Sequence, residues 1–237
     1  FFITAAWWFV FTIPYWRYVK QKSFIEKPEK PIKESFMRLW GTIKRIGEHK
    51  QVFLFLLAYF FYIDGVGTII KMATAIGSDM GLDSNSLIVI LLIVQIVAFP
   101  FSLLYGYLSK RFGNKKTLFL GIGTYILICV MALWLNSYTD FLILAILIGT
   151  AQGGVQSLSR SLFGQLIPAN RANEFFGFYN IFGKFSSILG TTLLGITAQM
   201  TGNSLDGVFS LIILFVIGSV LLFFVKLPTQ KGLENEG

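Results

Sequence analysis

Long apolar stretches separated by short polar connections dominate this chain of 237 residues. Most of the stretches are about 20 residues long, the length of helix needed to cross a hydrocarbon core of about 30 Å. A water-soluble domain does not need helices of that length repeatedly. The pattern therefore predicts an all-α integral membrane protein of about seven transmembrane helices. The predicted spans are 1–19, 51–76, 87–108, 117–136, 139–163, 173–198 and 206–227.

Lysine and arginine alternate strictly between the connections that join these spans. Eighteen of the twenty bases lie in every second connection, and the other two, Lys71 and Lys184, lie inside spans. Cytoplasmic loops carry an excess of Lys and Arg, so the first span should enter from outside and the C-terminus should be cytoplasmic. The same rule explains the net charge of +8 without a nucleic-acid partner. A mean hydropathy of +0.68 and a charged fraction of 14% also exclude a soluble domain.

The connection 20–50 is longer than the others and carries many of the bases. It opens with a proline-bearing charged stretch, 27–31, that cannot form a continuous helix. Apolar residues between Ile32 and Ile46 then recur at helical spacing among basic ones. This pattern predicts an amphipathic helix, which lies either on the cytoplasmic membrane surface or against the protein's own cytoplasmic face.

Six closely linked spans follow, forming a predicted transmembrane bundle over 51–227, with a cytoplasmic tail at 228–237. They divide into two triplets, 51–136 and 139–227, that enter the membrane from opposite sides. Such triplets are typical of the inverted-topology repeats of transporters. The inverted symmetry rests on topology, because the two triplets show no evident similarity in sequence.

Two opposite charges are predicted to lie near the middle of the membrane. Asp64 lies roughly 20 Å and Lys184 roughly 15 Å from the basic end of its span, at 1.5 Å per residue. A lone charge there costs at least about 2.5–3.5 kcal/mol, so such residues usually face a cavity or a partner. One interpretation is a central site in which Asp64 binds a proton or cation and Lys184 attracts an anionic group. The other is an ion pair that joins two helices. Lys71 lies nearer the outer surface, where it can snorkel to water.

Other polar residues inside the spans are candidates for lining the same pathway. Gln152 and Gln156 are one turn apart, and Asn180 stands one turn before Lys184 and should face the same way. Glycines beside the two glutamines have the spacing of close helix packing, which explains them without a ligand.

Nothing in the chain predicts an enzyme, a cofactor or a metal site. His49 and Cys129 are the only histidine and cysteine, and they cannot make a zinc site by themselves. No serine has a base at a recognisable distance, and no phosphate-binding glycine loop is present.

The connection 106–116, Gly-Tyr-Leu-Ser-Lys-Arg-Phe-Gly-Asn-Lys-Lys, resembles the cytoplasmic signature loop of the major facilitator superfamily. The resemblance implies a tight basic turn that caps a neighbouring helix end and latches one conformation. Lys110 stands where the family has its acidic residue, and Glu174 is the candidate to replace that acid from the next cytoplasmic connection. The residues that match the signature are Gly106, Leu108, Arg111, Gly113, Lys115 and Lys116.

Within that superfamily, the stretches 61–70, 152–161 and 167–180 resemble the vacuole-effluxer family of fungal amino-acid exporters and their bacterial relatives. The resemblance implies a twelve-helix secondary transporter of small solutes, with amino acids as cargo, in a bacterial plasma membrane. This chain would supply the sixth span (1–19), the central loop and the second six-helix bundle, and its partner would be an N-terminal six-helix bundle. Proton coupling through Asp64 is a hypothesis suggested by its depth.

Two further classes stay open at this point. A seven-helix receptor fits the number of spans and the orientation, but not the long charged loop after the first span or the lack of an extracellular cysteine pair. A membrane scaffold without transport activity fits the spans equally well, and only a flux assay separates it from a transporter.

Overall fold

The computed structural model describes residues 1–19, 41, 49–168 and 171–227. The chain falls into two units, Phe1–Gly41 and Thr42–Gly237. In the first unit, helix α1 (Phe2–Tyr18) has no buried side chain, so its apolar surface requires lipid or another helix as its surroundings. Nearly all of the amphipathic helix predicted within 20–50, and the tail at 228–237, lie outside the described residues.

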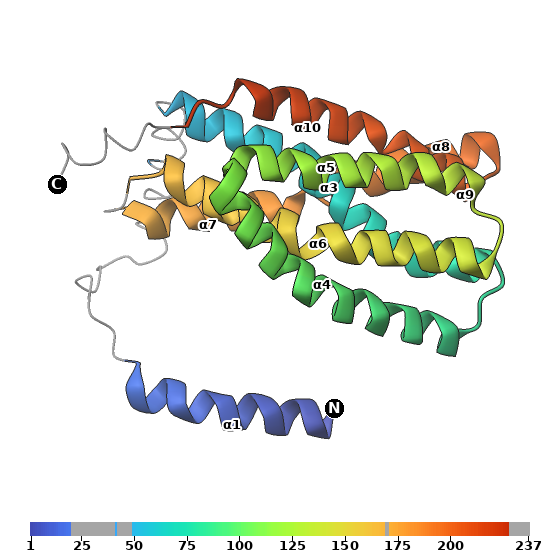
Figure 1. The fold of residues 1–237 in the computed structure, drawn as a ribbon, viewed down its shortest axis with the longest axis horizontal. Coiled ribbons are helices and arrows are strands. Elements are labelled where there is room, and N and C mark those ends of the chain that lie inside the picture. The colour runs from blue at the N-terminus through green and yellow to red at the C-terminus, as the bar shows by residue number, and fades with distance from the viewer. Residues whose placement is uncertain (20–40, 42–48, 169–170, 228–237) are drawn as a thin grey trace. The chain divides into compact units, whose positions relative to one another are not determined.

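The second unit is a helical bundle whose long helices run alongside one another (Figure 1). Six stretches of its described residues are long and apolar enough to span a membrane, and none of its described residues forms a strand. The all-α membrane fold is therefore confirmed. The predicted span 117–136 ends in a 3₁₀ turn, Ala132–Trp134, and the predicted spans 173–198 and 206–227 are each built from two helices. The helices are α3 (Lys50–Asp79), α4 (Ser84–Phe112), α5 (Asn114–Met131), α6 (Tyr138–Leu166), α7 (Ala172–Phe185), α8 (Ile188–Thr201), α9 (Ser204–Ser210) and α10 (Ile212–Phe224).

Short polar signals place the turns between the helices. Asp83 precedes α4, and its carboxylate accepts from the backbone N–H groups of Asn85 and Ser86, which have no intrahelical partner. The Ser86 hydroxyl and these N–H groups hold the pKa of Asp83 below its usual value. Gly113 joins α4 to α5 at φ +88°, a backbone region that glycine enters at little cost.

Helix α6 packs closely on α4 because glycines line their contact. A Cβ on Gly149 would lie 2.9 Å from the backbone oxygen of Val94, and a Cβ on Gly153 would lie 3.2 Å from that of Ala98. A backbone oxygen cannot swing aside as a side chain can, so these positions fix the distance between the two helices. The packing role expected of these glycines is confirmed.

The two ends of the bundle differ in charge. At the end that contains the Gly113 turn, called the basic end below, Lys115 Nζ donates to the carbonyl oxygens of Phe223 (2.8 Å) and Val225 (2.7 Å). These carbonyls lie at the C-terminus of α10, where backbone acceptors lack intrahelical donors. The expected capping of a neighbouring helix end by the 106–116 turn is thus present. The connections at 80–83, 135–137 and 202–203 form the opposite end.

The helices are unequally covered by their neighbours. In the most apolar window of α3, 56% of residues are buried, against 11% in α4 and 17% in α7–α8. Helix α3 is therefore central, whereas α4 and α7–α8 present broad faces that this unit does not cover.

Candidate functional site

The structure places Asp64 at the centre of the bundle, fully buried near the midpoint of α3. The Gly190 amide N–H donates to Asp64 Oδ1 at 2.9 Å, and the Thr68 hydroxyl donates to the same oxygen at 3.4 Å. The second oxygen, Oδ2, is buried and has no hydrogen-bond partner among the described residues. A buried acceptor without a partner costs about 1–3 kcal/mol. This oxygen is therefore available to a proton or another donor.

The partner of Asp64 lies at a break in the membrane-spanning stretch 172–201. Helix α7 ends at Phe185, Ser186 and Ser187 form a turn, and α8 starts at Ile188. The first N–H groups of a helix have no intrahelical acceptor, and they carry the positive end of the helix dipole. Asp64 supplies one of the missing acceptors from a different helix, so it stabilises the break.

Lys71 contacts the same break two turns further along α3. Its Nζ donates to Ser187 Oγ at 2.7 Å, although the side chain as a whole is exposed. The sequence led us to expect that Lys71 snorkels to water, and the contact with Ser187 at the start of α8 was not part of that prediction. An acidic and a basic side chain on one face of α3 thus hold adjacent parts of the start of α8.

Lys184 does not join Asp64 in the described structure. It lies in the last turn of α7, two residues before the break, with its side chain exposed, and no salt bridge links it to Asp64 within the described residues. Asn180 is exposed on the same helix. Asn180 and Lys184 therefore lie on the face of α7 that the rest of this unit does not cover, away from the buried carboxylate of Asp64.

The two glutamines of α6 are also separated. Gln152 is half-buried, and its Oε1 is buried without a hydrogen-bond partner in the described residues. Gln156 is exposed and does not line the cavity that Gln152 reaches.

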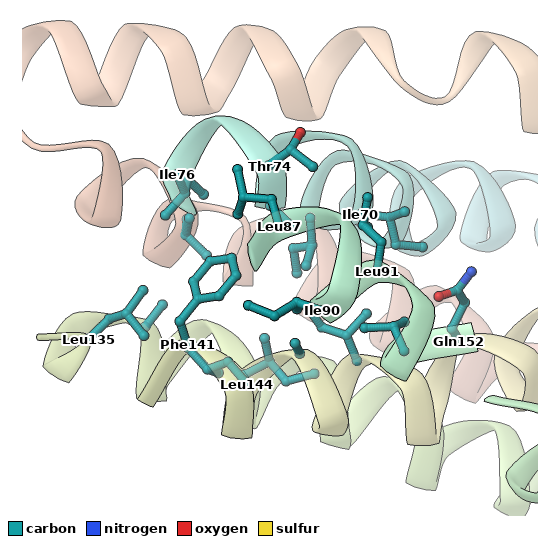
Figure 2. Close-up of a pocket in the computed structure, with 18 of the residues that line it drawn as sticks. Ile70, Thr74, Ile76, Leu87, Ile90, Leu91, Leu135, Phe141, Leu144 and Gln152 are labelled. Atoms are coloured by element: carbon teal, nitrogen blue, oxygen red, sulfur yellow. The ribbon is translucent and has the colours of Figure 1, made fainter. Parts of the chain in front are cut away.

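That cavity has a volume of about 240 Å³ and lies between α3, α4, α6 and α9, in the half of the bundle away from the basic end. Figure 2 shows Gln152 at one end of the cavity and Leu135 at the other, with aliphatic side chains and Phe141 between them. Among the described residues, Thr74, Gln95 and Gln152 are its polar lining residues, and none of the lining side chains is charged. This cavity could not be predicted from the sequence, because most of its lining residues are those of an ordinary apolar core.

Aromatic side chains fill the half of the bundle nearer the basic end. Tyr59 of α3 stacks on Tyr179 of α7 with ring centroids 4.2 Å apart, and Phe163 of α6 stacks on Tyr179 at 5.0 Å. Tyr62 Oη and Ser159 Oγ are 2.7 Å apart and buried. This cluster was also absent from the sequence prediction, although Phe55, Tyr59 and Tyr62 recur on α3 at helical spacing.

The proposed conformational residues lie at the basic end. Gly106 is within α4, Arg111 lies 5.4 Å from the ring centroid of Phe112, and Lys116 is exposed in the first turn of α5. Glu174 is exposed in the first turn of α7. Among the residues that matched the signature loop, Lys115 makes the clearest contact, with the end of α10.

Comparison with protein families gives one match over nearly the whole chain. Residues 1–236 match the family described as vacuole effluxer Atg22 like. A Bacillus subtilis protein with the name uncharacterized MFS-type transporter YxiO is 55% identical over 236 residues, which cover 100% of this chain and 55% of that protein.

Fungal relatives are more distant. Autophagy-related protein 22 of Pichia angusta is 26% identical over 270 residues, covering 98% of this chain and 48% of that protein. Autophagy-related protein 22-1 of Penicillium rubens is 26% identical over 255 residues, covering 97% of this chain and 43% of that protein. The chain spans about half the length of the curated relatives it matches.

Proposed function

Because this chain belongs to the vacuole effluxer Atg22-like family, we propose that the full-length protein is a secondary active transporter of a small solute. The printed name of the Bacillus subtilis relative, an MFS-type transporter, supports the same activity class. Amino acids or related metabolites are the proposed cargo, by resemblance to the family. The chain is an integral multi-pass membrane protein, and the plasma membrane of a bacterium is its proposed location. No enzymatic step is part of the proposal.

One observation carries the mechanism: a fully buried carboxylate in the middle of the bundle with one oxygen committed to the start of α8 and one without a partner. Binding a proton at Asp64 Oδ2 removes the negative charge that faces the positive end of the α8 dipole. Protonation therefore weakens the contact between α3 and α8, and loss of the proton strengthens it. Proton occupancy is in this way coupled to the position of α8.

The exposed polar residues belong to the pathway side of the bundle in this proposal. Lys184 and Asn180 on α7, and Gln156 on α6, face an N-terminal six-helix bundle that supplies the other wall. Lys184 attracts the anionic group of the cargo, and Gln152 lines the pathway from within. Alternating access then exposes this midplane region to each side of the membrane in turn.

The basic end faces the cytoplasm in this proposal, as the positive-inside rule requires. The turn formed by Gly106, Arg111, Gly113, Lys115 and Lys116 holds that end in one conformation, with Glu174 as the acidic partner in the next connection. Lys115 contributes by tying the start of α5 to the end of α10.

The test is flux through the full-length protein in proteoliposomes, with a panel of amino acids and with or without a pH gradient. We expect the gradient to drive accumulation of at least one amino acid. Asp64→Asn should abolish this accumulation but retain exchange of labelled for unlabelled cargo, because the asparagine Oδ1 can still accept from the Gly190 N–H. Asp206→Asn, at the opposite end of the bundle, is the matched control and should keep gradient-driven accumulation.

Three outcomes would each remove a part of the proposal. Intact gradient-driven accumulation in Asp64→Asn would end the role of Asp64 in coupling. Flux of other solutes but of no amino acid would reject the cargo class. The absence of flux for any solute, in protein shown to be folded, would favour a scaffold.

A further inference from the structure

The cavity beside Gln152 lies where neighbouring helices leave a gap. Glycine contacts with the backbone of α4 fix that helix against α6, as described above. Consecutive helices α3 and α4 touch little along their length, so side chains from both line a space between them. The space therefore persists as part of the fold.

Its size and lining match a small ring compound. An apolar cavity of about 150 Å³ in another protein stays dry and binds benzene. The cavity here measures about 240 Å³ and is partly open at the surface of the bundle, which leaves room for a second ring or a substituent and a way in for the ligand. Aliphatic side chains such as Ile90, Leu144 and Ile148, together with Phe141, form most of its wall.

Gln152 adds a specific polar requirement. Its Oε1 is buried and accepts no hydrogen bond within the described residues, and the side chain lies at one end of the cavity. An acceptor left in this state is costly, so a ligand with one N–H or O–H donor gains affinity by reaching it. Gln95, on the facing helix α4, also lines the cavity.

Water and charged molecules fit the cavity less well than an uncharged ring compound does. A buried water makes about three hydrogen bonds to polar groups, whereas most of the described residues that line this cavity are apolar. A charged group would lose part of its hydration without gaining an opposite charge, because none of the described lining residues is ionisable. A zwitterionic amino acid fits the cavity poorly on the same ground, so the cavity is distinct from the part of the pathway where Lys184 is proposed to attract the cargo.

We propose that this cavity is a binding site for an uncharged one- or two-ring compound that donates a single hydrogen bond to Gln152 Oε1. Indole has the required shape, and its N–H is a donor without acceptor strength. Indene has nearly the same shape and lacks the donor. The difference in affinity between the two isolates the contribution of Gln152 from that of the apolar wall.

Binding is measured on the full-length protein in lipid nanodiscs, by fluorine NMR of 5-fluoroindole and its displacement by unlabelled indole or indene. Empty nanodiscs give the background from partition into lipid. We expect saturable binding, with indole displacing the probe about three- to tenfold more effectively than indene, the worth of one satisfied acceptor.

Variants on the same helix identify the donor contact. Gln152→Leu keeps a side chain of similar size and should bring the indole-to-indene ratio close to one. Gln165→Leu, an exposed position on α6 outside the cavity, should keep the wild-type ratio. An unchanged ratio in Gln152→Leu would overturn the assignment of the acceptor.

Variants that fill the cavity test whether the ligand binds inside it. Ala145→Phe on α6 and, as a milder second variant, Ala73→Leu on α3 place side chains in the space, and each should abolish or strongly weaken saturable binding of 5-fluoroindole. Binding that never exceeds partition into empty nanodiscs, or that survives both filling variants in folded protein, would refute the site. Neither result depends on solute flux, so the proposed transport function stands or falls separately.

Discussion

Replacing Gly190 with alanine should loosen α8 from α3 at the point where Asp64 holds it. A Cβ at this position would lie 2.7 Å from Asp64 Oδ1 and would overlap Thr68 Oγ1. Both atoms are the tips of fully buried side chains, so they can turn away only by giving up their hydrogen bonds. The added methyl group therefore acts on the contact that the mechanism requires.

The size of the effect follows from two contributions. Leaving the buried Asp64 Oδ1 without its donor costs about 1–3 kcal/mol. Overpacking a filled interior by one methyl group costs about 1–3 kcal/mol. We therefore expect the free energy of unfolding to fall by about 2–6 kcal/mol, or Tm by roughly 4–24 °C at about 2–4 °C per kcal/mol for a domain of this size.

Cys129 provides the assay, because it is fully buried on α5 and is the single cysteine of this chain. Its reaction with a fluorogenic maleimide on heating reports unfolding of the bundle, provided that cysteines elsewhere in the full-length protein are replaced by serine. Gly195→Ala is the matched control on α8: a Cβ there meets nothing within 4 Å. It should leave Tm unchanged or raise it, since alanine favours a helix over glycine by about 1 kcal/mol.

A second variant tests whether the clash is the cause. Thr68→Ala removes the hydroxyl that the new methyl group of Gly190→Ala would meet. The loss of unfolding free energy in the double variant Thr68→Ala/Gly190→Ala should therefore be smaller than the sum of the losses in the two single variants. A Tm for Gly190→Ala equal to that of Gly195→Ala would refute the close contact between α3 and α8.

Two further predictions concern the basic end and the aromatic cluster. Lys115→Met should lower the free energy of unfolding by about 0.5–1.5 kcal/mol, because two partly exposed carbonyls at the end of α10 exchange their lysine donor for water. Lys116 is exposed, so Lys116→Met should change the free energy of unfolding little, and equal effects of the two variants would contradict the cap. Ser159 Oγ donates to the Val155 carbonyl at 2.6 Å, so Tyr62 must be the donor in its bond to Ser159. Tyr62→Phe should therefore cost about 1 kcal/mol, and Ser159→Ala more, because it leaves a buried phenol unpaired. The thiol-reactivity assay measures both pairs, and a larger loss in Tyr62→Phe would reverse the assignment.

The depth of Asp64 could be predicted because it depends on quantities that are local to the sequence. The rise per residue and the basic residues at one end of the span suffice to place the carboxylate near the middle. The break between α7 and α8 could not be predicted in the same way. Two serines inside an apolar run are compatible with an unbroken helix, and the acceptor that Asp64 supplies from α3 to the Gly190 N–H is a long-range contact that the local sequence does not encode.

Gln152 and Gln156 are one turn apart but lie in different surroundings. A shared helix face is therefore only an approximate guide to which side chains line the same cavity. Four residues advance an α-helix by about 400°, so the second side chain is offset by about 40° from the first. At the edge of a buried stripe, that offset turns one side chain into the cavity and the other onto the uncovered face. The cavity itself is a gap between helices, and its position depends on how closely α4, α6 and α3 pack, which the order of apolar residues does not encode.

Asp64→Asn and Gly190→Ala act on the same contact by different means, and together they separate a structural cap from a proton site. The first leaves an acceptor for the Gly190 N–H but removes the titratable group, whereas the second leaves the titratable group but displaces it. A contact that only stabilises the helix break predicts a stability loss in Gly190→Ala and little change of any kind in Asp64→Asn. A proton site predicts that Asp64→Asn, which carries no charge and cannot release a proton, loses gradient-driven accumulation although the Gly190 N–H keeps its acceptor. Gradient-driven accumulation in Asp64→Asn therefore distinguishes the two roles, while the Tm of Gly190→Ala shows whether the contact itself is present.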